Sequence, residues 1–544
     1  MTRPTFAWNL PRNQARRIER RMEWLWILGL LLAALILFLT NLGGLPLRDW
    51  DEGTVAQVAK EIWRAPPESQ RWLFPTLWES PYLNKPPLIH GLIALAYSLG
   101  GVNEWTARFP GAILTAISVP LLYGIGREIF PYRRPAIFSA LIYLTLLPVV
   151  RHGRLAMLDG SVLCFAMLMI WCASASRRDL RWSLGAGIGF GLICLTKGMM
   201  GLLLGTVALA FLAWDTPRLL RSAYLWGGIL LGSAPAVAWF AAAWWHYHQE
   251  FIGTGIVDQS LQRIWGEVDE HGAPPWYYFM PLLRSFPWLL FSLYGIRLAW
   301  ENRNWGWAKL VLVWSGIYFF AVSVMVTKLP WYILPIYPAL ALAGGAKLAE
   351  VWHWPSYRSY PRAWTIVLAL LTVGAGAASV YFCISEASDH SLVVIISAVA
   401  LTMAVAAVLV ARNDQQFMTI LFWGMYVSLL LLVSSSHWLW ELNETYPVNP
   451  VAALIQRGTP PGEVVYTSFD YERPSLNFYS DRRVIPATNQ ELKQRWEQAP
   501  SPYLLLDANT FKQLDLKSGH RLYTLTQDWV LLSKEKIRAN EAVK

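Results

Sequence analysis

The chain has few charged residues and few cysteines. Asp, Glu, Lys and Arg make up 15% of its 544 residues, whereas about a quarter is usual in a soluble domain. Its four cysteines all lie inside apolar segments, and none forms a Cys-x-x-Cys pair or another metal-binding spacing. The low charge excludes an ordinary soluble protein, and the cysteines are interpreted as small buried hydrophobic residues.

Long apolar runs fill most of the first 440 residues instead. Because one crossing of a bilayer takes roughly 20 apolar residues, they predict about thirteen transmembrane helices. The 31 Trp and 23 Tyr suit such a protein, since their amphipathic rings favour membrane interfaces. The expected fold class is a polytopic α-helical membrane protein. The predicted spans cover approximately residues 23–41, 106–126, 136–151, 159–176, 183–196, 198–214, 223–245, 277–299, 306–326, 330–351, 364–384, 391–411 and 416–438.

The arginines indicate which loops share a side of the membrane. If the spans alternate, one side receives the arginine-rich N-terminus and most of the basic loops. Cationic flanks stay in the cytoplasm, so we expect a multi-pass inner (plasma) membrane protein with a cytoplasmic N-terminus. The net charge of +10 is concentrated in these short segments, so nucleic acid is not an expected partner. The arginines on this side are Arg12, Arg16, Arg17, Arg20, Arg21, Arg127, Arg133, Arg134, Arg177, Arg178, Arg181, Arg218, Arg221, Arg297, Arg303, Arg358, Arg362 and Arg412.

The opposite, periplasmic side receives a first loop over residues 42–105, a second segment over 246–276, and everything after Leu439. In the first loop, Trp72–Leu77 and Leu88–Leu99 are apolar but too short to span, which predicts helices lying in the interface. We expect a transmembrane catalytic domain over residues 1–440 and a small periplasmic α/β domain over 441–544. Strands of that domain are predicted at Val464–Thr467, Arg483–Ile485, Tyr503–Leu506 and Trp529–Leu532, with helical segments at 476–480 and 489–497.

Charged residues from separate periplasmic turns are predicted to meet at one membrane surface. An acidic pair, Asp51 and Glu52, follows the first span, and Asp159 begins the fourth. Carboxylates at such a surface are costly unless they are used. The candidate residues are Asp51, Glu52, Lys85, Asp159, Lys197, Arg263 and Lys328, with Tyr82, Arg154 and His271 as further candidates.

These residue types indicate a reaction class. Arginine offers bidentate contact and lysine a point charge to a phosphate at the level of the lipid headgroups. A carboxylate takes a proton from an acceptor hydroxyl or orients an attacking oxygen. Together they predict group transfer from a lipid-linked phosphate donor, with the cations stabilising the charge on the leaving phosphate.

Several of these residues also have a plain structural interpretation, whereas Lys85, between Asn84 and Pro86, has no helix-end role and favours function. The Asp51-Glu52 pair and Asp159 stand where acidic residues cap helices. Lys197 and Lys328 stand where lysines at helix ends extend to the interface. His271 is otherwise an ordinary loop histidine. The hypothesis of a shared site depends on all of these residues lying on one side, which is improbable as coincidence.

In order along the chain, these motifs resemble a known family. They are Asp51-Glu52, Lys85-Pro86, Leu158-Asp159, Thr196-Lys197-Gly198, Gln262-Arg263, Ala273-Pro274 with Trp276-Tyr277-Tyr278, and Lys328-Leu329-Pro330 with Tyr332-Ile333-Leu334. The chain resembles the GT-C glycosyltransferases of the protein mannosyltransferase superfamily, and within it the aminoarabinose transferases that modify lipid A. The resemblance covers roughly residues 20–350, and the α/β tail agrees with it.

The resemblance implies a GT-C fold, a polyprenyl-phosphate sugar donor, typically undecaprenyl phosphate-linked, and inverting transfer on the periplasmic face. It implies that Asp51 and Asp159 act around the acceptor and that Lys85 and other cations hold the donor phosphate. Tyr332 and Tyr337 would line the phosphate site. The family's divalent metal is not carried over, because Asn84 and Ser260 stand where its Glu and His ligands are expected, and both are poor zinc ligands. No cofactor is predicted.

Three functions are compatible with these observations. The first is transfer of a sugar, such as 4-amino-4-deoxy-L-arabinose, from a polyprenyl phosphate to lipid A or another envelope glycolipid or glycan. The second is protein O-glycosylation, with a Ser or Thr hydroxyl as acceptor. The third is a lipid-sugar transporter, which the nearly uncharged middles of the spans and the lack of an internal repeat disfavour.

Overall fold

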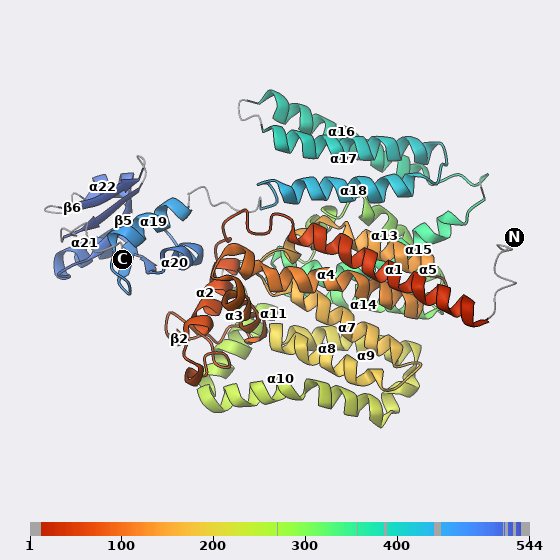
Figure 1. Ribbon diagram of the computed structural model, residues 1–544, viewed down its shortest axis with the longest axis horizontal. Coiled ribbons are helices and arrows are strands. Elements are labelled where there is room, and N and C mark those ends of the chain that lie inside the picture. Colours follow the sequence, from red (N-terminus) through yellow and green to blue (C-terminus); the bar gives the residue numbers. More distant parts are fainter. Residues whose placement is uncertain are drawn as a thin grey trace. The chain divides into compact units, whose positions relative to one another are not determined.

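The computed structural model describes residues 12–268, 270–355, 357–385, 389–439, 448–514, 516, 520–525 and 529–534 (Figure 1). Two compact units form. The first unit consists of Met1–Leu42, Leu83–Ile89 and Phe109–Trp438, and the second of Gly43–Tyr82, His90–Arg108 and Leu439–Lys544. Most of the expected first loop thus groups with the C-terminal segment. The expected domain boundary at residue 441 lies outside the described residues and stays a prediction.

The chain is a multi-pass membrane protein. Eight helices of its described part are long and apolar enough to span a membrane, or nine if α5 and α6, bent by 60°, form one broken span. The expected number of thirteen stays a prediction, because α3, α7, α8 and α9 are apolar but shorter. The spans are α1 (Arg12–Leu39), α4 (Glu104–Ile129), the stretch Ala223–Trp265 that begins with α10 (Ala223–Glu250), α14 (Gly306–Val324), the stretch Pro330–Trp352 that ends with α15 (Tyr337–Trp352), α16 (Arg362–Ile384), α17 (His390–Ala411) and α18 (Phe417–Ser434).

Shorter elements complete the first unit. A bend separates α5 from α6 at Pro148, which lacks a backbone donor and is tolerated at a helix start. The elements are α5 (Arg133–Leu144), α6 (Leu147–Gly153), α7 (Asp159–Ala175), α8 (Trp182–Lys197), α9 (Met200–Asp215), η2 (Pro217–Arg221), the π-helical η3 (Phe251–Leu261), α11 (Gln262–Trp265), α12 (Phe279–Leu283), α13 (Trp288–Glu301) and η4 (Pro330–Ile336).

Close packing fixes the helices that carry the candidate residues. Helix α8 packs against α7, α9 and α10 (Figure 1). Glycines allow the backbones of α8 and α10 to approach: a Cβ on Gly187 would lie 2.2 Å from the Gly228 carbonyl oxygen, and one on Gly232 would lie 2.2 Å from the Ile188 nitrogen. Small residues permit this approach between membrane helices. The end of α8, where Lys197 stands, is therefore held by three neighbouring helices.

The second unit begins with the first-loop elements. They are α2 (Asp51–Arg64), η1 (Pro67–Ser69), β1 (Thr76–Leu77), β2 (Ser80–Pro81) and α3 (Leu88–Gly100). The helix expected at Leu88–Leu99 is confirmed as α3. The helix expected at Trp72–Leu77 is wrong, because this stretch forms turns and then pairs Thr76–Leu77 with Ser80–Pro81. Pro75 lacks the backbone donor that a helix interior needs.

The C-terminal part of the second unit is a layered α/β structure. Its elements are α19 (Val448–Gly458), β3 (Val464–Thr467), α20 (Pro474–Ser480), β4 (Arg483–Pro486), α21 (Asn489–Gln498), β5 (Tyr503–Asp507), α22 (Ala508–Leu514), β6 (His520–Leu525) and β7 (Trp529–Ser533). The strand order is β4-β3-β5-β7-β6; β4, β3 and β5 are parallel, and β7 and β6 are antiparallel additions. The predicted strands correspond to β3, β4, β5 and β7, while β6 was not predicted.

Side chains that alternate along the strands build a hydrophobic core on each face of this sheet. Leu505 and Leu531 pack in one core with residues of α19 and α20. Leu504 and Leu506 pack in a second core with Leu492 and Trp496 of α21. Because successive side chains of a strand point to opposite faces, an uninterrupted apolar run such as Tyr503–Leu506 is expected for a strand covered on both sides.

Candidate active site

The first unit contains a cavity of about 460 Å³. Lys85 and Lys197 bring positive charge to a wall that is otherwise mostly apolar. Such a wall suits a ligand with a hydrocarbon chain and an anionic head. The lining residues are Leu83, Asn84, Lys85, Pro86, Phe190, Cys194, Lys197, Gly198, Met199, Leu202, Ser233, Ala236, Val237, Trp239, Phe240, Ala241, Phe251, Gly255, Ile256 and Ser260.

An ion pair joins two candidates beside this cavity. Asp159 is the first residue of α7, and its Oδ1 lies 2.6 Å from Nζ of Lys197, the last residue of α8. Both side chains are at most 10% exposed. Gly198 follows with a φ of +52°, a left-handed conformation that ends the helix where a side chain would be strained. The Lys197 ammonium also lies 5.4 Å from the centre of the Tyr332 ring.

Gln259 bridges two further cations, and Tyr332 links them to Lys197 of this pair. Its Oε1 accepts hydrogen bonds of 3.4 Å from Lys85 Nζ and from Arg263 Nη2. Arg263 also donates through Nη1 to the Tyr332 hydroxyl at 3.0 Å. We call this group the cationic cluster; it consists of Lys85, Asp159, Lys197, Gln259, Arg263 and Tyr332. It brings together five of the predicted residues, and Gln259 carries no signal in the sequence that would have indicated it.

Lys328 and Tyr337 make other contacts. The Lys328 ammonium donates to the carbonyl oxygens of Ser323, at 3.0 Å, and Met325. It is buried, and burial lowers its pKa. The hydroxyl of Tyr337 is directed to the Pro281 carbonyl oxygen, at 3.5 Å. These contacts are with residues outside the cationic cluster, so the predicted role of both side chains at the donor phosphate stays a prediction.

Arg154 and His271 also have local surroundings of their own. Arg154 is fully buried, and its guanidinium donates to the carbonyl oxygens of Leu37, Phe38 and Thr40 at the end of α1. These contacts satisfy carbonyl groups that a helix end leaves without partners. His271 is exposed, and its backbone carbonyl accepts from the Lys328 N–H at 2.9 Å.

The second unit holds the acidic pair at the start of α2. Glu52 is fully buried and pairs with Arg108: Nε to Oε1 is 2.8 Å and Nη2 to Oε2 is 2.9 Å. Asp51 keeps 30% of its side chain exposed and lies 3.5 Å from Arg48. Tyr82 is buried; burial raises its pKa, and the nearby Asp51 charge raises it further. Of the acidic pair, Asp51 is therefore the more accessible carboxylate.

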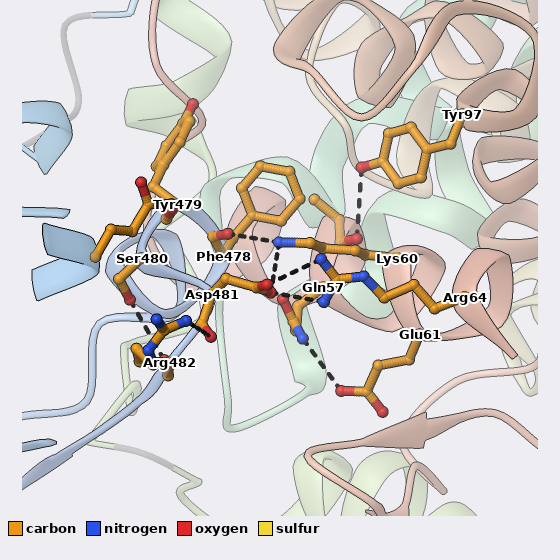
Figure 2. Close-up of polar contacts among 12 residues, drawn as sticks. Gln57, Lys60, Glu61, Arg64, Tyr97, Phe478, Tyr479, Ser480, Asp481 and Arg482 are labelled. Atoms are coloured by element: carbon orange, nitrogen blue, oxygen red, sulfur yellow. Dashed lines mark hydrogen bonds and ion pairs between the residues drawn. The ribbon is translucent and has the colours of Figure 1, made fainter. Parts of the chain in front are cut away.

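Polar contacts join α2 to α20 within the second unit, as Figure 2 shows. Lys60 Nζ lies 2.9 Å from Asp481 Oδ1 and donates to the Phe478 carbonyl oxygen at 3.0 Å. Arg64 donates to both oxygens of Asp481, at 2.7 and 2.9 Å. Although burial raises the pKa of Asp481, the hydrogen bonds from Arg64 and Lys60 outweigh it and hold this pKa at about 2. The helix carrying Asp51 is thus anchored by the C-terminal segment.

The metal associated with the resembling family does not fit the residues of this chain. Asn84 and Ser260 both line the cavity, and a carboxamide and a hydroxyl are poor ligands for zinc. Among the residues that the structure describes, no group of three or more His, Cys, Asp or Glu side chains gathers in a metal-binding arrangement. We derive no chemical step through a metal.

Comparisons with known proteins place this geometry in context. Residues 84–244 match the family described as dolichyl-phosphate-mannose-protein mannosyltransferase. The undecaprenyl phosphate-alpha-4-amino-4-deoxy-L-arabinose arabinosyl transferase 1 of Pseudomonas fluorescens is 30% identical over 354 residues, 60% of each chain. That of Pectobacterium carotovorum is 29% identical over 324 residues, 56% of each. The expected resemblance is confirmed.

The fold agrees with this resemblance along nearly the whole chain. The crystal structure of ArnT from Cupriavidus metallidurans bound to undecaprenyl phosphate matches with a TM-score of 0.76 and 18% identity, over 95% of this chain and 99% of that one. The fold is therefore an ArnT-like GT-C membrane fold. In sequence, the match spans about 60% of the length of the P. fluorescens relative.

Proposed function

We propose that the chain is an inverting glycosyltransferase. It moves a sugar, such as 4-amino-4-deoxy-L-arabinose, from a polyprenyl phosphate donor, such as undecaprenyl phosphate, to lipid A or another envelope glycolipid or glycan. The observation that carries this proposal is the cationic cluster beside a largely apolar cavity of about 460 Å³. The cavity suits a polyprenyl segment and the cations suit its phosphate.

The residues have separable roles in such a transfer. An acceptor oxygen bonds to the anomeric carbon of the sugar, and the bond from that carbon to the donor phosphate oxygen breaks. The electron pair leaves on the phosphate, and Lys85, Lys197 and Arg263 stabilise its charge. Where the acceptor is a hydroxyl, Asp51 receives its proton. Glu52 was also a candidate for catalysis, but because it is buried against Arg108 we propose that it positions the start of α2 instead.

The resemblance and the charge pattern together support a membrane placement. We propose that the chain lies in the inner membrane with about thirteen spans, a cytoplasmic N-terminus and a periplasmic C-terminal α/β domain. Single cysteines at His271 and Arg303, in a background without native cysteines, test this with a membrane-impermeant maleimide added from the periplasmic side. We expect labelling at position 271 and not at 303; the reverse result contradicts the proposed sidedness.

A transfer assay tests the activity. Purified protein in lipid nanodiscs is mixed with an undecaprenyl phosphate-linked sugar and either lipid A or an acceptor peptide, and products are read by mass spectrometry. We expect glycosylated lipid A, and loss of at least about a hundredfold in kcat/KM for Asp51→Asn. Lys85→Gln should chiefly raise the KM for donor. Arg297→Gln is the matched control, because Arg297 is 78% exposed and pairs only locally with Glu301. Transfer to the peptide alone favours protein O-glycosylation, and no transfer to any acceptor refutes the proposal.

A further inference from the structure

The residue before Asp51 has a strained backbone. Trp50 has φ 57° and ψ −80°, and the Asp51 N–H donates to the Asp49 carbonyl oxygen at 2.7 Å. This is a γ-turn with a left-handed central residue, which is rare and unfavourable for a bulky side chain. Such a conformation persists only where the surroundings impose it, and it is concentrated at functional sites.

The C-terminal segment imposes this turn. Asp49 is buried, and its carboxylate accepts hydrogen bonds from the backbone N–H of Ser475 at 3.0 Å, from the Ser475 hydroxyl, and from Arg473 Nη1 at 3.2 Å. The backbones are in direct contact here, because a Cβ on Gly53 would lie 2.5 Å from the Ser475 nitrogen. Residues 49–53 therefore cannot relax without releasing the start of α20.

The turn exposes an aromatic pair beside Asp51. Trp50 is 52% exposed and Tyr471 42% exposed, and their rings stack with centres 6.3 Å apart and an interplanar angle of 26°. Arg473 fixes Tyr471, because it donates to the Tyr471 hydroxyl at 3.1 Å and lies 4.7 Å from the ring centre. The exposed acids Asp470 and Glu472 flank Tyr471. The pair is thus held in place, accessible, and surrounded by hydrogen-bonding groups.

We propose that Trp50 and Tyr471 form a subsite for the sugar ring of the acceptor glycolipid. The negative face of an aromatic ring attracts the polarised C–H groups of a sugar, and nearby carboxylates accept hydrogen bonds from its hydroxyls. This inference rests on the proposed glycosyl transfer, with Asp51 acting at the acceptor oxygen.

Steady-state kinetics with lipid A as the varied acceptor and saturating undecaprenyl phosphate-linked sugar test the subsite. For Trp50→Ala and Tyr471→Ala we expect the KM for acceptor to rise roughly tenfold, while kcat and the KM for donor change by less than about twofold. Trp50→Phe should retain most of the affinity. Trp72→Ala is the matched control, because Trp72 is an exposed tryptophan of the same unit.

A soluble probe distinguishes a sugar subsite from a membrane anchor. The deacylated glucosamine disaccharide of lipid A should inhibit the wild type competitively against lipid A and should inhibit Trp50→Ala roughly tenfold more weakly. If the wild type transfers sugar but Trp50→Ala keeps its KM for acceptor and its inhibition by the disaccharide, the subsite is refuted while the transferase remains. If Trp50→Ala and Tyr471→Ala reduce only membrane insertion, the pair is an interfacial anchor and the subsite is also refuted. Absence of transfer by the wild type refutes the transferase itself.

Discussion

Substituting each member of the acidic pair separates a reacting carboxylate from a structural one. Glu52 accepts two hydrogen bonds from Arg108 and a third, at 2.9 Å, from the backbone N–H of Arg48. In Glu52→Gln, the amide removes the negative charge and turns one acceptor into a donor facing the guanidinium. Breaking a buried ion pair by removing one partner costs about 3–5 kcal/mol. We therefore expect Glu52→Gln to lower the thermal stability markedly.

Asp51→Asn should behave in the opposite way. Asp51 is partly exposed, and its pair with Arg48 spans 3.5 Å, so its loss should change stability by less than about 1 kcal/mol. Its loss should nevertheless strongly reduce turnover, because the proposed mechanism assigns the acceptor proton to Asp51. Thermal unfolding in nanodiscs and the transfer assay measure the two effects on the same preparations.

A double variant makes the test decisive. Glu52→Gln with Arg108→Met removes both charges and should recover much of the lost stability, since a buried pair is often replaceable by neutral side chains. Turnover should recover with stability if Glu52 only positions α2. A Glu52→Gln protein with wild-type stability and no turnover would refute this reasoning and make Glu52 a reacting group.

Three further results are expected. Gly53→Ala should destabilise the second unit by about 1–3 kcal/mol, because the new Cβ would meet backbone atoms. Gly91→Ala should not destabilise it, because the space around that Cβ is open. Thermal unfolding compares the two variants. The low pKa of Asp481 means that its ion pairs stabilise the fold above pH 3.8 and are lost as the pH falls through about 2. The protection factors of the α20 amides in hydrogen exchange should therefore fall there, and already at neutral pH in Asp481→Asn. If the Lys328 ammonium holds the donor phosphate, turnover should decline as the pH rises, and because the pKa of Lys328 is lowered this decline should begin below pH 10.5. Lys328→Arg should remove the decline from a pH–rate profile.

Local sequence patterns were sufficient for much of the fold. The apolar run at Tyr503–Leu506 predicted β5 because strand side chains alternate between two covered faces. The break between α8 and α9 was predicted near Gly198, where the backbone is left-handed. The helix predicted at Trp72–Leu77 is absent although the stretch is apolar, because Pro75 alone removes a helical hydrogen bond.

The sequence indicated site residues only where the side of the membrane on which a loop lies was enough to bring them together. Parity along the spans indicated that Lys85, Lys197 and Arg263 share a surface, and these three residues are connected in the structure. No periodicity indicates Gln259, because its contacts depend on the π-helical path of η3. Arg154 was also a candidate because its loop was predicted on the same side as these residues. A guanidinium can equally satisfy the carbonyl groups of a neighbouring helix end, and only tertiary contacts decide which of the two roles it takes.

The pairing of Asp159 with Lys197 shapes what a phosphate can gain from the cationic cluster. A lysine at most 10% exposed is costly to keep charged, and Asp159 offsets that cost at 2.6 Å before any substrate arrives. In the proposed transfer, a donor phosphate would meet a cation that is already desolvated and oriented, so little reorganisation would be left for the reaction step. The same contact fixes the Asp159 carboxylate against the Lys197 ammonium. We therefore propose that Asp159 holds the cation in place and that Asp51 receives the acceptor proton.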